Sequence, residues 1–210
     1  MTHQPTILKK LSFFVRRLPP YDAKRSVASL LIGRVKDVAL EHVKPMVDTF
    51  RRPFDAQLTG PDLVGVEIGV FKGYHSRQLV RLPSVKTLFC VDPYLSYDEN
   101  GHEAYMQTIK DEAKRRLSFS DKVRWVHMLS HYAAAGAPMV DFVYIDGEHS
   151  RPSVALDVQS WWPRLKPGGI MGGHDYTEKW PGVIMAVSEF ATHNCLQLHV
   201  CQPDWWVFKK

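Results

Sequence analysis

The sequence has 210 residues, of which 45% are hydrophobic and 23% are charged, so it can build a full core and is not expected to be disordered. No apolar run is long enough to span a bilayer, and the first residues lack the apolar stretch of a signal peptide. The three cysteines are too few for a disulfide framework and show no metal-ligand spacing. We therefore expect a globular, cytoplasmic protein without structural disulfides.

The net charge of +5 belongs to the N-terminal part of the chain. Residues 1–60 contain 11 Lys and Arg against 5 Asp and Glu, whereas the remaining residues contain 16 against 17. The first part therefore carries +6 and the rest carries −1. A basic segment of this kind either contacts an anionic membrane surface or a polyanion, or simply presents a solvated helical face, and we favour the solvated face.

Two helices are predicted before residue 60, at 5–18 and at about 24–50. In the second of them, apolar residues recur every three or four positions. We expect this N-terminal extension, residues 1–60, to cap the site or to build a homo-oligomer. Residues 55–62 include Gly60-Pro61 and are interpreted as a linker into a second domain that spans 61–210.

From Leu63 onward, strand-like apolar runs alternate with helix-like segments. Such alternation predicts a parallel sheet with helices on both faces, which is a doubly wound, Rossmann-like α/β fold. Only three residues separate the last two strands, so they form a hairpin that adds an antiparallel strand to a mostly parallel, seven-stranded sheet. The predicted strands are 63–69, 87–92, 123–128, 141–146, 169–173, 197–201 and 205–209, and the predicted helices are 74–81, 100–119, 152–161 and 182–192.

The first strand runs into a glycine-containing turn, EIGVFKG at 67–73. Glycines at a strand-to-helix turn let the backbone approach a ligand closely, although a tight structural turn would use them equally well. The spacing is not that of a GxGxxG dinucleotide fingerprint, and no Gly-Lys-Ser/Thr phosphate-binding loop is present. Asp92 ends the second strand, where an acid is well placed to accept hydrogen bonds from ribose hydroxyls.

Two later strands each end in ionisable residues. Asp146, Glu148 and His149 follow one of these strands, and His174 and Asp175 follow the next. Because the carboxyl ends of parallel strands meet at one edge of the sheet, these five groups should converge on a single site. Carboxylates and imidazoles are the groups that bind divalent metals or transfer protons, so this edge is the predicted active site.

Five segments together resemble class I S-adenosylmethionine-dependent methyltransferases. The resemblance covers residues 63–210 and is closest to the metal-dependent sugar and polyketide O-methyltransferases, which include macrocin- and mycinamicin-type enzymes. It implies methyl transfer to a sugar, polyketide or phenolic hydroxyl of a small molecule. The segments are EIGVFKG (67–73), VDPY (91–94), DFVYIDGEHS (141–150), LKPGGIMGGHDY (165–176) and PGVIMAVSEF (181–190).

The resemblance also implies roles for individual residues. The His-Asp pair after the fifth strand departs from the Asp-Asn and all-acidic pairs of relatives, and a histidine ligand would widen the metal choice from Mg²⁺ to Mn²⁺, Fe²⁺, Co²⁺ or Zn²⁺. The implied metal ligands are Asp146, His174 and Asp175. The implied cofactor-binding residues are Glu67, Gly69 and Gly73 for the methionine part, Asp92 for the ribose, Ser130 and His131 for the adenine, and Asp146.

A hydroxyl is a poor nucleophile while it keeps its proton, so the reaction needs a general base. His149 and Glu148 are both candidates at the predicted edge. We favour His149, because an ordinary histidine pKa of about 6.5 is near working pH, whereas Glu148 would need a raised pKa. Without a metal, His149 would remain the base and His174-Asp175 would hydrogen-bond the substrate.

Two other functions remain open at this point. The isoelectric point near 9.1 suggests a nucleic-acid methyltransferase, but the basic excess lies outside the second domain and no Asn-Pro-Pro-Tyr-type motif follows the fourth strand. A non-catalytic membrane- or partner-binding module would keep the fold and use the basic N-terminus. The favoured interpretation implies a small-molecule acceptor, no nucleic-acid partner and a homo-oligomer.

Overall fold

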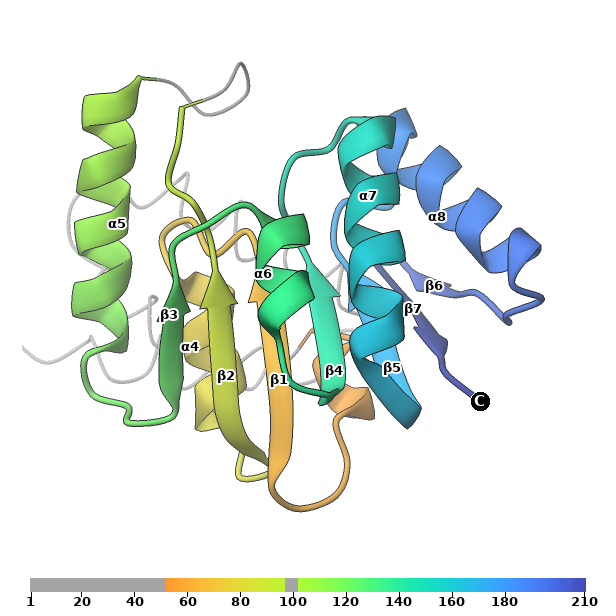
Figure 1. Cartoon of the computed structure of the whole chain (residues 1–210), viewed down its shortest axis with the longest axis horizontal. Helices are drawn as coiled ribbons and strands as arrows, with labels where there is room; N and C mark the ends of the chain where they lie inside the picture. The colour runs from red at the N-terminus through yellow and green to blue at the C-terminus, as the bar shows by residue number, and fades with distance from the viewer. Residues whose placement is uncertain (1–51, 97–101) are drawn as a thin grey trace, which may run out of the picture. The chain divides into compact units, whose positions relative to one another are not determined.

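Seven strands form one mixed sheet in a computed structural model that describes residues 52–96 and 102–210 (Figure 1). The strand order is β3-β2-β1-β4-β5-β7-β6, in which the neighbours up to β5 are parallel and β7 runs antiparallel to β5 and β6. This confirms the predicted doubly wound sheet with its C-terminal hairpin. The strands are β1 (Leu63–Ile68), β2 (Val85–Val91), β3 (Val123–Val126), β4 (Val140–Ile145), β5 (Leu165–Gly173), β6 (His199–Cys201) and β7 (Asp204–Phe208).

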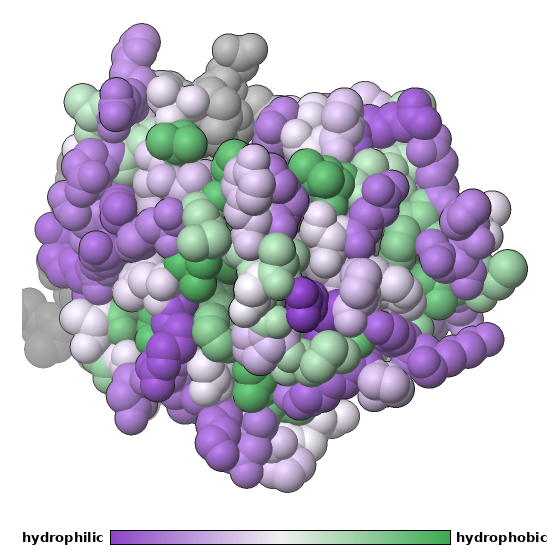
Figure 2. All heavy atoms as spheres, viewed as in Figure 1, coloured by the Kyte–Doolittle hydropathy of each residue, from purple (hydrophilic) through white to green (hydrophobic). Residues whose placement is uncertain are grey.

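The helices lie on both faces of the sheet. Helices α6, α7 and α8 cover the front face in Figure 1 and α4 lies behind it, while the hydrophilic (purple) side chains at the left of Figure 2 gather over α5. The helices are α4 (Tyr74–Arg81), α5 (Glu103–Leu117), α6 (Ser130–Gly136), α7 (Arg151–Trp161) and α8 (Pro181–His193), with 3-10 turns η1 (Asp55–Gln57) and η2 (Trp162–Arg164). Helices predicted at 5–18 and 24–50 lie outside the described residues.

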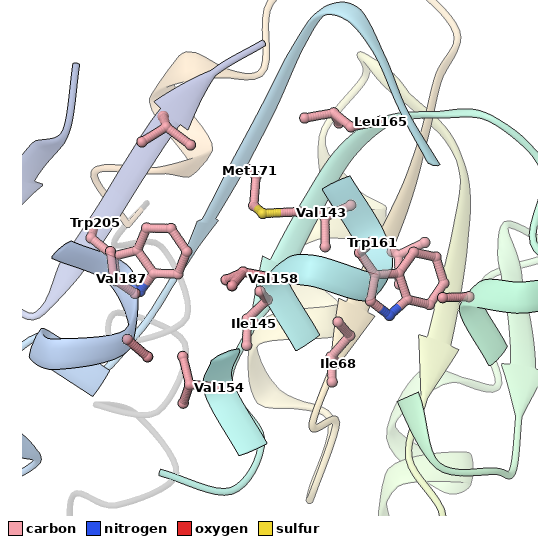
Figure 3. Close-up of a cluster of buried hydrophobic side chains, with 14 of the residues drawn as sticks. Ile68, Val143, Ile145, Val154, Val158, Trp161, Leu165, Met171, Val187 and Trp205 are labelled. Carbon is pink, nitrogen blue, oxygen red and sulfur yellow. The ribbon is translucent and has the colours of Figure 1, made fainter. Parts of the chain in front are cut away.

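Each face of the sheet buries its own hydrophobic cluster. One cluster joins β1, β4 and β5 to α7 and α8 through side chains such as Val143, Val158 and Trp205, several of which are shown in Figure 3. The other joins the opposite face of the same strands to η1, α4 and α5. Strand β4 contributes to both clusters, because Phe142, Val143 and Tyr144 are all fully buried and alternate between the two faces of the sheet.

The segment that precedes β1 is part of this core rather than a linker. Phe54 is fully buried, and its ring packs edge-on against Phe142 and Tyr144 with centroids 6.3 and 4.9 Å away. A Cβ added at Gly172 would lie only 2.5 Å from the Phe54 ring, so β5 leaves room for it. The compact unit therefore begins at Pro53. Gly60-Pro61 predicts a linker and a domain boundary at residue 61, whereas the apolar contacts of Phe54 extend the compact unit to the residues before it.

Among the described residues, no helix combines the length and apolarity needed to cross a membrane.

Helix α6 was not predicted from the sequence, because its seven residues include three alanines and end in a glycine, without an apolar periodicity.

Candidate active site

The turn after β1 is shaped by two glycines with positive φ. Gly69 has φ +81°, and a Cβ there would lie 2.1 Å from the carbonyl oxygen of Asp146, so only glycine fits between the ends of β1 and β4. Gly73 has φ +72° and begins α4 as its N-terminal flanking residue. We call residues 69–73 the glycine loop. The glycine loop lies at the carboxyl end of β1, as the sequence predicted.

Asp92 holds the glycine loop against the end of β2. Its Oδ2 accepts a hydrogen bond from the backbone N–H of Phe71 and its Oδ1 accepts one from that of Tyr94, both at 2.8 Å. Burial raises the pKa of Asp92, while the backbone N–H groups oppose the rise. An ionised carboxylate has about four acceptor positions, so Asp92 can hold the loop and still accept bonds from a ribose.

Glu67 is nearly fully buried and faces α4. Its Oε1 lies 2.9 Å from Nδ1 of His75, and its Oε2 accepts a short hydrogen bond from the hydroxyl of Ser76. These partners could not be recognised from the resemblance that implies a methionine-binding role for Glu67. The predicted contact of Glu67 with the cofactor stays a prediction.

Ser130 and His131 begin α6, beyond the end of β3. The Ser130 hydroxyl accepts a hydrogen bond from the Trp161 indole at 2.8 Å and also bonds the carboxyl of Asp157 on α7. Burial raises the pKa of Asp157 to about 7, with a further contribution from the charge of Glu148 and an opposing one from Ser130. The ring of His131 lies 4.1 Å from that of Tyr132. Their predicted adenine contact is not tested by this arrangement.

The ionisable residues at the ends of β4 and β5 do converge. Donor atoms of Asp146, His149 and Asp175 all lie within 4.8 Å of one another. Nε2 of His149 is 2.9 Å from Oδ2 of Asp175, and Nδ1 of His174 is 3.1 Å from the same oxygen and 3.8 Å from Oδ1 of Asp146. His174 therefore lies beside both carboxylates of the predicted trio, and the group of three whose ligand atoms all lie within 4.8 Å of one another contains His149. We call these four residues the acid–imidazole cluster.

Asp175 is the centre of the acid–imidazole cluster. Burial alone would raise its pKa, but hydrogen bonds and charge from His149 and His174 outweigh burial and hold the pKa below its usual range. The residue has φ +61°, and the backbone N–H of His174 donates to the carbonyl oxygen of Ile145 at 3.0 Å, which ties the turn after β5 to the end of β4. The carboxylate is thus held ionised between two imidazoles.

Glu148 and His149 are adjacent in sequence but face different neighbours. Oε2 of Glu148 accepts a hydrogen bond from the Ser153 hydroxyl at 2.8 Å, so this carboxylate is directed toward α7. The ring of His149 stacks on Trp180, with centroids 4.1 Å apart and planes 22° from parallel. Of the two predicted bases, His149 is the one inside the acid–imidazole cluster.

The donor set fits a divalent metal. Two ligands at right angles, each roughly 2.1 Å from an ion, lie about 3 Å apart. The separations of 2.9 and 3.1 Å from Asp175 to the two imidazoles are also those of hydrogen bonds, so the fit rests on the ligand atoms of Asp146, His149 and Asp175, which lie within 4.8 Å of one another. Carboxylate oxygens and imidazole nitrogens together suit Mn²⁺, Fe²⁺, Co²⁺ or Zn²⁺ as well as Mg²⁺.

Comparison with known proteins agrees with the fold and the glycine loop. The sequence profile of a family described as "Methyltransferase domain" matches residues 66–176, which is more than half of the chain. The chain belongs to this family, and with its fold this makes it an S-adenosylmethionine-dependent methyltransferase. Uncharacterized protein R132 of Acanthamoeba polyphaga mimivirus is 22% identical over 182 residues, covering 82% of this chain and 76% of that protein.

Solved structures share the fold at low sequence identity. The O-methyltransferase NovP has a TM-score of 0.55 and 18% identity over 74% of each chain. CalS11, a TDP-rhamnose 3'-O-methyltransferase of calicheamicin biosynthesis, has a TM-score of 0.54 and 14% identity, covering 99% of this chain and 96% of its own. SMU.1697c of Streptococcus mutans, solved with SAH, has a TM-score of 0.56 and 11% identity, covering 75% of this chain and 97% of its own.

Proposed function

We propose that the protein is an O-methyltransferase that modifies a hydroxyl group of a small molecule, with a divalent metal at the acid–imidazole cluster. The observation that carries the proposal is the convergence of Asp146, His149 and Asp175 at the strand ends next to the glycine loop. Methyl transfer to a hydroxyl needs a group that takes up the proton, and this cluster adjoins the glycine loop, where we propose that the cofactor binds.

The glycine loop and Asp92 suit the cofactor. Gly69 leaves no side chain at the junction of β1 and β4, and the buried carboxylate of Asp92 lies at the end of β2 for a ribose. When bound, S-adenosylmethionine supplies a sulfonium methyl group that an oxygen nucleophile attacks in line, at about 3 Å.

His149 is the proposed base, and its partner sets its tautomer. Asp175 accepts a hydrogen bond from Nε2–H of His149 at 2.9 Å, so Nδ1 carries the lone pair in the neutral ring. This lone pair would take up the proton that the acceptor hydroxyl loses when its oxygen is methylated. A metal held by Asp146, Asp175 and His174 would lower the pKa of that hydroxyl, which leaves the role of base to His149.

A glycan-type hydroxyl is the acceptor class we propose first. The support is the resemblance to sugar O-methyltransferases and the likeness in fold to CalS11, which acts on TDP-rhamnose. Trp180 lies beside His149 and has an aromatic face of the kind on which a sugar or phenol ring can pack.

Titration calorimetry tests the cofactor and the metal together. S-adenosylhomocysteine is titrated into EDTA-treated full-length protein, alone and with Mg²⁺, Mn²⁺ or Zn²⁺. We expect micromolar binding that Asp92→Ala abolishes, while Asp121→Ala, at an exposed position, leaves it unchanged. Absence of binding under all these conditions would refute the use of this cofactor.

Mn²⁺ binding followed by electron paramagnetic resonance tests the metal without turnover. The wild type should bind Mn²⁺, and Asp146→Asn and Asp175→Asn should each weaken binding at least about tenfold. The wild type is then incubated with sugar nucleotides, macrolides and catechols, and methylated products are detected by mass spectrometry. Methylation of a nucleic acid but of none of these acceptors would replace the small-molecule proposal.

A further inference from the structure

The two ends of the glycine loop are joined by a buried hydrogen-bonded network. Glu67 precedes the loop, and His75 and Ser76 follow it in the first turn of α4. Nδ1 of His75 lies 2.9 Å from Glu67, Nε2 lies 2.9 Å from Oδ1 of Asp55 in η1, and Ser76 donates to Glu67. The side chains of Asp55, Glu67 and His75 are at most 4% exposed. We call these four residues the clasp.

The clasp determines the protonation of its histidine. A carboxylate has no proton to donate, and a neutral imidazole has one N–H, yet both ring nitrogens of His75 face carboxylate oxygens. Ser76 donates a second hydrogen bond to Glu67, at the oxygen that does not face His75. Carboxylates on either side stabilise a positive ring, and an imidazolium can donate to both of them.

The Asp55 end of the clasp is held in place by contacts with β7 and β4. Asp55 follows Phe54, whose backbone N–H donates to Oδ2 of Asp204 on β7 at 3.3 Å. Oδ1 of Asp204 accepts a hydrogen bond from the Tyr144 hydroxyl at 3.0 Å, and the Tyr144 ring lies 4.2 Å from His75. A continuous buried path therefore runs from β7 through residues 54–55 to both ends of the glycine loop.

We propose that His75 is a positioning residue, an imidazolium that bridges Glu67 and Asp55 and thereby sets the conformation of the glycine loop. The consequence for cofactor affinity rests on the proposed function. The protonation state and the order of the loop do not, so they can be tested in the protein alone.

The charge of His75 is measured by ¹⁵N NMR of the imidazole rings in the full-length protein, with the signals assigned by their loss in His75→Gln. We expect both ring nitrogens of His75 to remain protonated at pH 7, where an imidazole with the ordinary pKa of about 6.5 is mostly neutral. A neutral His75 ring at pH 7 would overturn the charge assignment. In Asp55→Asn the ring should become neutral, because an amide can donate to Nε2.

The positioning role is measured by amide hydrogen exchange and by calorimetry. In His75→Gln, which can bond only one carboxylate, the amides of Phe71 and Gly73 should exchange at least about tenfold faster while those of β5 change little. Binding of S-adenosylhomocysteine should weaken by about tenfold, which is the loss of one hydrogen bond to a charged group.

His193→Gln is the matched control, because this histidine is exposed at the end of α8, and both readouts should match the wild type. Unchanged exchange of the loop amides in a folded His75→Gln protein would refute the positioning role. If the wild type does not bind S-adenosylhomocysteine, the proposed function fails, and the NMR and exchange results still decide the role of His75.

Discussion

Gly69 is a residue whose replacement can be predicted from backbone geometry alone. Gly69→Ala places a Cβ 2.1 Å from the Asp146 carbonyl oxygen in a left-handed conformation, so the ends of β1 and β4 must separate. We expect a loss of about 3 kcal/mol or more in the free energy of unfolding, measured by denaturant titration. Cofactor binding should be lost as well, because the displaced strand end carries Asp146.

Gly136→Ala is the corresponding control. Gly136 ends α6, and a Cβ there would meet no atom within 4 Å. The substitution should leave the free energy of unfolding unchanged or raise it by up to about 1 kcal/mol, since alanine favours helix over glycine. Equal losses for the two alanine variants would contradict a role for the fit between β1 and β4.

Asp157 should make stability depend on pH. Its pKa is raised from 3.8 to about 7 by burial, so the folded state binds this proton more tightly than the unfolded state. The stability that the protonated form contributes is complete below about pH 4 and is lost as the pH rises toward 7. Asp157→Asn stays neutral at every pH. Its free energy of unfolding relative to that of the wild type should therefore rise between about pH 4 and pH 7, by up to about 4 kcal/mol.

Thermal unfolding of the two proteins at intervals between pH 4 and pH 8 checks this prediction. A difference in melting temperature that stays constant across that range would show that Asp157 does not hold its proton in the folded protein. Glu148→Gln should lower the pKa of Asp157, because the charge of Glu148 raises that pKa. The pH range over which the stability difference changes should therefore become narrower.

Individual site residues were predictable where a strand end determines their place. The sequence predicted that Asp146 and Asp175 would meet, and they do, because parallel strands bring their carboxyl ends together. It left the base open between His149 and Glu148, since the directions of these side chains depend on side-chain rotation and on the stacking of His149 on Trp180. The contact of His75 with Asp55 could not be predicted, because Asp55 lies in residues 55–62, which the sequence indicates as a linker.

The short connection between β5 and α8 should affect the reaction through Trp180. Its ring stacks on His149 and thereby orients Nε2 toward Asp175. On the proposed function, Trp180→Ala should lower kcat by about tenfold with little change in the affinity for S-adenosylhomocysteine, because the base loses its orientation. Trp180→Phe should retain most of the activity, since a ring remains for stacking.

Steady-state kinetics with the identified acceptor, combined with calorimetry, separates these effects. Loss of cofactor affinity in both variants, with kcat preserved, would indicate that Trp180 supports the cofactor rather than His149. The neighbouring Lys179, whose ammonium lies 4.8 Å from the Trp180 ring, offers Lys179→Met as a variant that changes the charge but leaves the aromatic ring in place.

Elements with a clear apolar pattern were easier to predict than elements without one. The bounds of α4 were predicted to the residue, and β1 and β4 differ from prediction by about one residue at an end, because each has a clear apolar pattern. Strand β5 begins earlier than predicted, at Leu165, since Lys166 and Pro167 obscure its start. Helix α6 and the turn η1 are too short for periodicity to reveal.

The extent of the folding unit yields a prediction for two fragments. Both hydrophobic clusters draw on residues from 54 onward, and Phe54 is fully buried in one of them. A fragment of residues 53–210 should therefore unfold cooperatively on heating. A fragment of 61–210 lacks Phe54 and Asp55, so it should lose about 3–5 kcal/mol from the missing aromatic ring alone.

Circular dichroism during heating distinguishes the fragments. The shorter fragment should melt at a lower temperature or show no cooperative transition, and equal melting curves would place the boundary at residue 61 after all. The sequence predicted the class of fold correctly because alternation of strands and helices extends over most of the chain. The predicted boundary at residue 61 differs from the compact unit that begins at Pro53, because one buried aromatic residue leaves no periodic signal.

The contact of Phe54 with Gly172 also has an evolutionary consequence. A Cβ at residue 172 would lie 2.5 Å from the Phe54 ring, although the two positions are far apart in the sequence. The same Cβ would also lie 2.4 Å from the carbonyl oxygen of Trp205, so a larger residue at 172 displaces the β7 backbone whatever residue stands at 54. An aromatic residue at 54 together with glycine at 172, read from an alignment of relatives, would reveal which of them keep the segment before β1 docked on the sheet.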